Sequence, residues 1–132
     1  MQFTNPHPTC EVKFFQQSFF ICALFVLSVM RMSGAESLDQ SIDYLLKYIA
    51  NSKVVFIRNG TEYTPAQGVD HVKAKYAHFK KQIETPEDFI RLCASKSLLS
   101  KKPYLVRLAD GKEMRLDAWL TQALKAHQAG AE

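Results

Sequence analysis

Side chains that suit anion binding lie in a hairpin followed by a helix. Arg58 precedes an Asn59–Gly60 turn, and His71 and Lys75 are four residues apart, on one face of a predicted helix. We expect Arg58 to pair with Glu62 across the hairpin. The alternative is a ligand role, since a guanidinium presents a fork of donors to a carboxylate or phosphate.

The histidines form no metal motif. His71 and His78 are seven residues apart, two full helical turns, which is too far for one ion. The four-residue histidine pair typical of zinc-binding helices is absent. We expect His71 to be a solvated or hydrogen-bonded residue at the edge of the core, and we predict no metal and no cofactor.

A second group of polar side chains lies in the loop Ser95–Lys102 and directly after it. This loop also carries two leucines, Leu98 and Leu99, which we expect to be exposed. We predict that the two hairpin turns and this loop form the working surface, with Arg58, Lys101, Lys102 and Tyr104 as exposed contacts. The full candidate binding set is Arg58, His71, Lys75, Ser97, Lys101, Lys102 and Tyr104.

A hydrolase is the alternative from another functional class. It would use His71 as a base toward Ser95, Ser97 or Cys93, and it requires hydrogen-bond reach between them. Neither a G-x-S-x-G elbow nor a paired S-x-x-K motif stands out. We therefore name no catalytic residue, and we expect the serines to satisfy loop backbone and Cys93 to be a small core residue.

The charge balance favours an acidic partner only mildly. The 132 residues hold 17 Lys and Arg against 13 Asp and Glu, a net charge of +4. Basic and acidic residues are interleaved and form no basic stripe, so we predict no nucleic-acid binding.

The N-terminal segment resembles an export signal. Phe19–Met30 is an uncharged apolar run of 12 residues, shorter than the roughly 20 that a membrane span needs. Lys13 precedes it, and Ser33 and Ala35 place small residues before a cut at Glu36. We predict a signal peptide over 1–35 and one small domain over 36–132, periplasmic or secreted. The alternative is an uncleaved inner-membrane anchor, the only membrane contact we expect.

The pattern after residue 36 predicts two helix–hairpin–helix units. Ser37, Thr64, Thr85 and Asp117 are plausible helix caps. Asn59–Gly60 and Asp110–Gly111 are hairpin signals. We predict an α+β fold in which the two hairpins join into one four-stranded antiparallel sheet, with the helices packed on one face.

Several blocks of the chain resemble a bacterial exported family known only as domain of unknown function 5329. The likeness covers nearly all of 36–132. It rests on Phe56-Ile57-Arg58-Asn59-Gly60, His71, Lys75, Ile83, Thr85, Phe89-Ile90, Ala94-Ser95, Ser97 and Pro103-Tyr104-Leu105-Val106. The chain departs from the family pattern at Gly68, Val72, Pro86, Leu98 and Lys101. The resemblance implies export and supplies no activity.

These observations favour a non-catalytic exported module that binds an acidic partner. That partner is an envelope protein, a polymer, an anionic head group or a small ligand. Besides the hydrolase, a further alternative is a structural envelope protein that acts by self-association.

Overall fold

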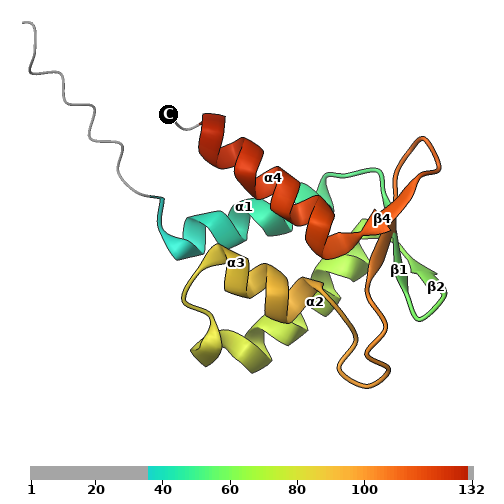
Figure 1. Cartoon of the computed structure of the whole chain (residues 1–132), viewed down its shortest axis with the longest axis horizontal. Coiled ribbons are helices and arrows are strands. Elements are labelled where there is room, and N and C mark those ends of the chain that lie inside the picture. The colour runs from blue at the N-terminus through green and yellow to red at the C-terminus, as the bar shows by residue number, and fades with distance from the viewer. Residues whose placement is uncertain (1–35, 131–132) are drawn as a thin grey trace, which may run out of the picture. The chain divides into compact units, whose positions relative to one another are not determined.

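Two helix–hairpin–helix segments follow one another along the chain, as predicted, in the computed structural model, which describes residues 36–130 (Figure 1). The first consists of α1 (Leu38–Ala50), β1 (Val55–Arg58), β2 (Thr61–Tyr63) and α2 (Pro65–Phe79). A 3-10 turn, η1 (Lys80–Gln82), joins it to the second. That segment consists of α3 (Pro86–Phe89), a π-helical continuation η2 (Ile90–Ala94), β3 (Leu105–Arg107), β4 (Glu113–Arg115) and α4 (Leu116–Gly130).

Three of the helices begin with a reciprocal cap. At α1 the Ser37 hydroxyl accepts from the Gln40 backbone N–H while the Gln40 side chain accepts from that of Ser37. Thr64 and Thr85 form equivalent boxes at α2 and α3, each followed by proline at the first helical position. Each box satisfies two otherwise unpaired donors, so the sequence fixes these helix starts locally.

The two hairpin turns differ in geometry. Asn59 and Gly60 have φ angles of 53° and 80°, as a type I′ turn requires, so this prediction is confirmed. In the second turn only Gly111 has a positive φ. The Leu108 N–H donates to the Lys112 carbonyl, and the Leu108 carbonyl accepts from the Gly111 N–H. The second hairpin therefore closes through a longer loop with glycine in the left-handed position.

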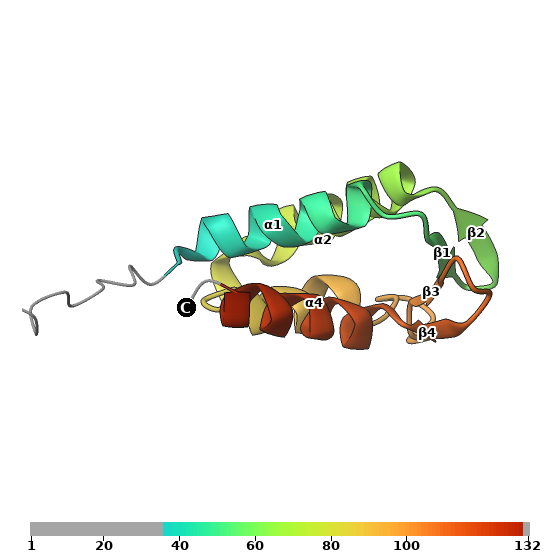
Figure 2. The same cartoon turned by 90° about the horizontal axis from the view of Figure 1, so that it is seen from above.

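The hairpins join into one antiparallel sheet of order β2-β1-β3-β4, through pairing of β1 with β3. Phe56 lies opposite both Tyr63 and Val106, so these three side chains share the face toward the helices. Figure 2 shows α1 beside α2 and α4 beneath them, all extending to the same side of the sheet. The predicted α+β architecture is confirmed.

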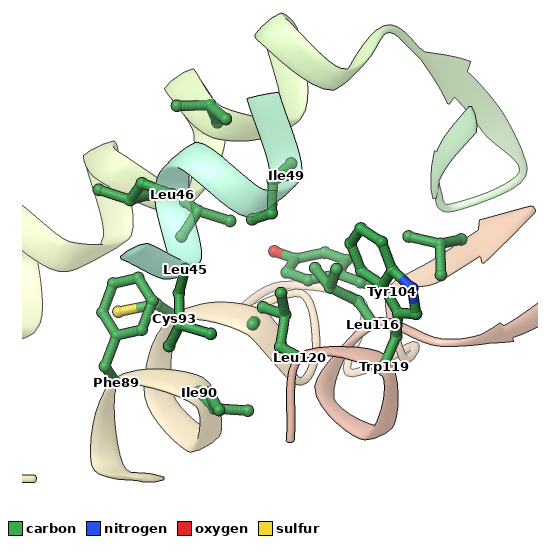
Figure 3. Close-up of a cluster of buried hydrophobic side chains, with 14 of the residues drawn as sticks. Leu45, Leu46, Ile49, Phe89, Ile90, Cys93, Tyr104, Leu116, Trp119 and Leu120 are labelled. Atoms are coloured by element: carbon green, nitrogen blue, oxygen red, sulfur yellow. The ribbon is translucent and has the colours of Figure 1, made fainter. Parts of the chain in front are cut away.

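The core lies between helices α1 and α2 on one side and α3, η2 and α4 on the other, and it reaches the inner face of the sheet (Figure 3). Its largest fully buried side chains are Tyr104, Phe56, Phe89, Leu45, Ile49, Leu116, Leu120 and Leu124. Helix α2 approaches β1 so closely that a Cβ on Gly68 would lie 2.8 Å from Cδ2 of Phe56. This close approach brings the next turn of α2, with His71, toward the end of β1.

None of the helices within residues 36–130 is long and apolar enough to cross a bilayer. The predicted signal peptide and its cleavage point lie outside the described residues.

Candidate functional site

Arg58 points toward the helices rather than along the outer surface of the sheet. The register places Thr61 opposite Arg58 and Glu62 opposite Ile57, and successive residues of a strand face opposite sides. Glu62 therefore lies on the other face, where it pairs with Arg107. The predicted Arg58–Glu62 pair is wrong, because residue counting across the turn does not show which face each side chain takes.

The Arg58 side chain lines a cavity between the first hairpin and α2. The cavity has a volume of about 300 Å³, and its walls are Phe56, Arg58, Tyr63, Gln67, Asp70 and His71. Nε of Arg58 is buried and has no hydrogen-bond partner among the described residues. Buried polar atoms of folded proteins are nearly always paired, so an unpaired donor on a side chain that lines a cavity is unusual.

His71 connects the cavity to the core. Its Nε2 lies 2.8 Å from the hydroxyl of Tyr104, and the two rings meet edge to face at 5.3 Å. Burial lowers the pKa of His71, and the charges of Arg58 and Lys75 lower it further. The imidazole is therefore neutral near neutral pH, and it is hydrogen-bonded to the Tyr104 hydroxyl.

Tyr104 is buried, with only 1% of its surface exposed, so the prediction that it is an exposed contact is wrong. Its ring packs 5.7 Å from that of Phe56, and the Lys75 ammonium lies 5.0 Å from the ring centroid. Burial raises the pKa of the Tyr104 hydroxyl, against an opposing contribution from the nearby Arg58 guanidinium, so the hydroxyl stays protonated. A polar tip on a buried ring lets Tyr104 belong to the core and still reach the site.

Lys75 is a buried cation, 6% exposed, with no ion pair among the residues that the structure describes. Its Nζ donates to the carbonyl of Lys96 at 2.7 Å. Burial lowers the pKa of Lys75, and the charges of Arg58 and Lys96 act in the same direction, against an opposing contribution from Cys93. Buried charges are usually paired, so this arrangement leaves positive charge uncompensated.

The seven candidate residues fall into two groups. Arg58, His71, Lys75 and Tyr104 converge at or just behind the cavity wall. Ser97, Lys101 and Lys102 instead stay with the loop, and Ser97 is buried there, with its hydroxyl 3.4 Å from the backbone N–H of Ser100.

The groups that a hydrolase would need are used elsewhere. The Ser95 hydroxyl donates to the Arg91 carbonyl at 2.6 Å, and Cys93 is fully buried, which raises its pKa to about 11. In the described part of the chain His71 has its side-chain hydrogen bond with Tyr104, not with a serine or Cys93. No cluster of three potential metal ligands is found in residues 36–130.

Four of the six residues that line the cavity are absent from the binding set predicted from the sequence: Phe56, Tyr63, Gln67 and Asp70. A usable signal was present: Gln67, Asp70 and His71 follow the i, i+3, i+4 spacing of one helix face, on the first turns after the hairpin.

The relative and the family that match this chain are both described without a function. The chain is 34% identical over 67 residues to the uncharacterized protein YfeK of Salmonella typhimurium, an alignment that covers 50% of this chain and 56% of that protein. The chain thus spans little more than half the length of this curated relative. No solved structure matches it significantly. The model of a family of unknown function, DUF5329, matches residues 36–128, and the chain belongs to that family.

Proposed function

We propose that this domain is a binding module for a small anionic molecule, which it holds in the cavity between Arg58 and His71. The observation that carries the proposal is Arg58, whose side chain lines that cavity and whose buried Nε has no partner in the described chain. A carboxylate or phosphate in the cavity supplies acceptors for the fork of donors that this guanidinium presents.

The local charge supports the same ligand class. Arg58 and Lys75 are both cationic and lie near His71, whereas the one acidic side chain in the cavity wall, Asp70, is exposed and makes no ion pair with either. An anion would compensate this excess in a partly desolvated site, where charge pairing is stronger than in water.

The rest of the wall suits a compact ligand with a second polar group. About 300 Å³ is at the small end of ligand cavities. Phe56 and Tyr63 supply apolar and aromatic contact, while Gln67 and Asp70 offer acceptors for a hydroxyl or amino group. The favoured ligand is therefore a small carboxylate or phosphate that also carries a hydrogen-bond donor.

The proposal also places this binding activity outside the cytoplasm. It is supported by the apolar run Phe19–Met30 with small residues before Glu36.

Ligand-induced stabilisation of residues 36–132 tests the proposal. These residues contain the whole described core and fall within one compact unit. Thermal melts with acetate, succinate, inorganic phosphate and amino acids should show a higher midpoint for at least one anion, and calorimetry should give its Kd. Arg58→Gln should abolish the shift. Arg58→Lys should weaken it, because an ammonium keeps the charge but loses the planar fork.

The matched control is Lys73→Gln, which removes one positive charge from an exposed position of α2. It should leave the affinity within about twofold, as expected for a screened surface charge. Equal loss of affinity in Lys73→Gln and Arg58→Gln would mean that net charge alone attracts the anion, and the pocket assignment would then be wrong.

A further inference from the structure

The loop from Lys96 to Pro103 has a defined conformation. An isolated β-bridge joins its two ends, Lys96 and Pro103. Within it the Ser97 N–H donates to the Lys102 carbonyl at 3.0 Å, and the Lys101 N–H donates to the Ser97 carbonyl at 3.1 Å. Lys101 has a φ of 59°, which closes the turn in the left-handed region. Backbone hydrogen bonds within this stretch therefore close it into a compact turn.

The loop is also fastened to the body of the domain at three points. The Ser100 hydroxyl donates to Oδ1 of Asn59 in the first hairpin turn, and the Lys96 carbonyl accepts from Lys75. Ser97, near the start of the loop, is buried against the domain and only 1% exposed. The side chains at the tip are therefore presented by a supported scaffold.

That scaffold presents apolar side chains to solvent. Leu98 is 45% exposed and Leu99 is 90% exposed, and they are the two exposed large hydrophobic residues of the described chain. Figure 1 shows the loop projecting from the domain, next to the β1–β2 turn. Adjacent exposed leucines on a protruding, hydrogen-bonded loop are poorly explained by packing within the chain, so they point to an external partner.

The charges around the leucines indicate the kind of partner. Lys96, Lys101 and Lys102 are all exposed, and none of them is in an ion pair within residues 36–130. No acidic residue occurs between Ser95 and Pro103. Two exposed leucines near three exposed lysines complement the interface of an anionic bilayer. The leucines can enter the acyl boundary while the lysines remain at the head groups.

We infer that this loop is a membrane-contact site, which inserts Leu98 and Leu99 into the surface of a bilayer that contains anionic lipid. A bilayer is favoured over a protein groove because the apolar surface consists of two leucines on a projecting loop that also carries three exposed lysines. The site is separate from the anion cavity: neither leucine is in the cavity wall. It is also a membrane contact beyond the predicted N-terminal segment.

Vesicle sedimentation of residues 36–132 tests this inference without the apolar N-terminal run, which would itself partition into lipid. The domain should sediment with vesicles rich in phosphatidylglycerol and remain in solution with phosphatidylcholine alone. Leu98→Ser with Leu99→Ser should weaken association about tenfold or more. Lys96→Gln with Lys102→Gln should weaken it roughly fivefold for each lysine.

The matched control removes two lysines from exposed positions on α2 and α4, Lys73→Gln with Lys125→Gln. It should change association less than about twofold, because these charges lie outside the loop. Equal weakening by both lysine pairs would overturn the inference, as would equal binding to neutral and anionic vesicles. So would capture of an acidic protein by the same leucines without any vesicle binding.

A fluorescent variant gives a second readout that does not depend on sedimentation. Leu99→Trp places an indole at the tip, while Trp119, the one native tryptophan, is 8% exposed and supplies a constant background. Anionic vesicles should shift the emission of Leu99→Trp to shorter wavelength. An unchanged spectrum at full sedimentation would show that another surface contacts the bilayer.

Discussion

Two arginines on neighbouring strands of one sheet have opposite surroundings. Arg107 of β3 lies on the outer face, where it donates to Glu113 at 2.9 and 3.0 Å and also pairs with Glu62. Arg58 of β1 lies on the inner face, beside the cavity, with a buried Nε that has no partner in the described chain. Glu62 and Glu113 both pair with the exposed Arg107, and neither pairs with Arg58.

This difference separates a structural arginine from a binding one. An exposed charge is already well solvated, so a network around Arg107 adds little to stability. A buried donor without an acceptor costs stability in the free protein, and that cost is removed when a ligand supplies the acceptor. We expect variants on the inner face to change both stability and ligand binding, and variants on the outer face to change neither appreciably.

The largest effect should come from Tyr104, which connects the core to the cavity. Tyr104→Ala removes a fully buried ring packed on Phe56 and should cost about 3–5 kcal/mol in urea unfolding. Tyr104→Phe keeps the ring but leaves His71 without its hydrogen bond, and it should cost about 1 kcal/mol. Equal costs for both variants would mean that the hydroxyl, not the ring, holds this part of the fold.

Replacing Lys75 should lower anion affinity without a comparable loss of stability. Lys75→Met keeps most of the side-chain volume and removes a buried charge that has no ion pair in the described chain. We expect its free energy of unfolding to rise or to stay within about 1 kcal/mol of wild type, while anion affinity falls. A loss near 3 kcal/mol in a urea melt would instead assign Lys75 a structural role through its bond to Lys96.

Local signals in the sequence predicted most of the elements, because each depends on neighbouring residues alone. The capping boxes at Ser37, Thr64 and Thr85 and the positive φ angles at Asn59–Gly60 are of this kind. They fix where helices start and where the first hairpin turns, and from them the α+β order follows. Asp117 is an exception: it was predicted as a cap, but it lies in the first turn of α4, which begins at Leu116.

The site was only partly predictable, because it depends on which face of the sheet each side chain occupies and on packing between residues far apart in the sequence. Glu62 was assigned to Arg58, but the strand register sends the two to opposite faces. Tyr104 was expected at the surface because its hydroxyl is polar, but pairing of β3 with β1 carries its ring into the core. The convergence of His71 with Arg58 needs the close packing of α2 on β1 at Gly68, which no local pattern reveals.

Acidification should weaken the fold through His71. Its pKa is lowered by burial and by nearby cations, so the unfolded chain binds a proton more readily than the folded chain. Stability should therefore fall as pH drops below the unfolded value of about 6.5 and toward the lower folded value. His71→Gln should flatten this slope between about pH 5 and 7.

His71 and the acidic groups affect stability in different pH ranges. Asp88 and Asp117 have pKa values lowered by their arginine partners, so their contribution to stability is lost only below their ordinary value of 3.8.

Anion affinity should rise as pH falls, because a protonated His71 adds a third positive charge beside the cavity. An affinity that is constant from neutral to mildly acidic pH would exclude His71 from contact with the ligand.

The smallest effect should come from the outer face. Arg107→Gln removes the centre of the ion pairs with Glu62 and Glu113, and these pairs raise the pKa of Arg107 without burying it. Because both partners remain solvated, the urea midpoint and the anion affinity should both stay close to wild type. The matched change Arg58→Gln removes the same charge from a strand that pairs directly with β3. If Arg107→Gln reduced anion affinity as much as Arg58→Gln, the two faces would not differ in function, and the ligand would be attracted by the overall charge of the sheet.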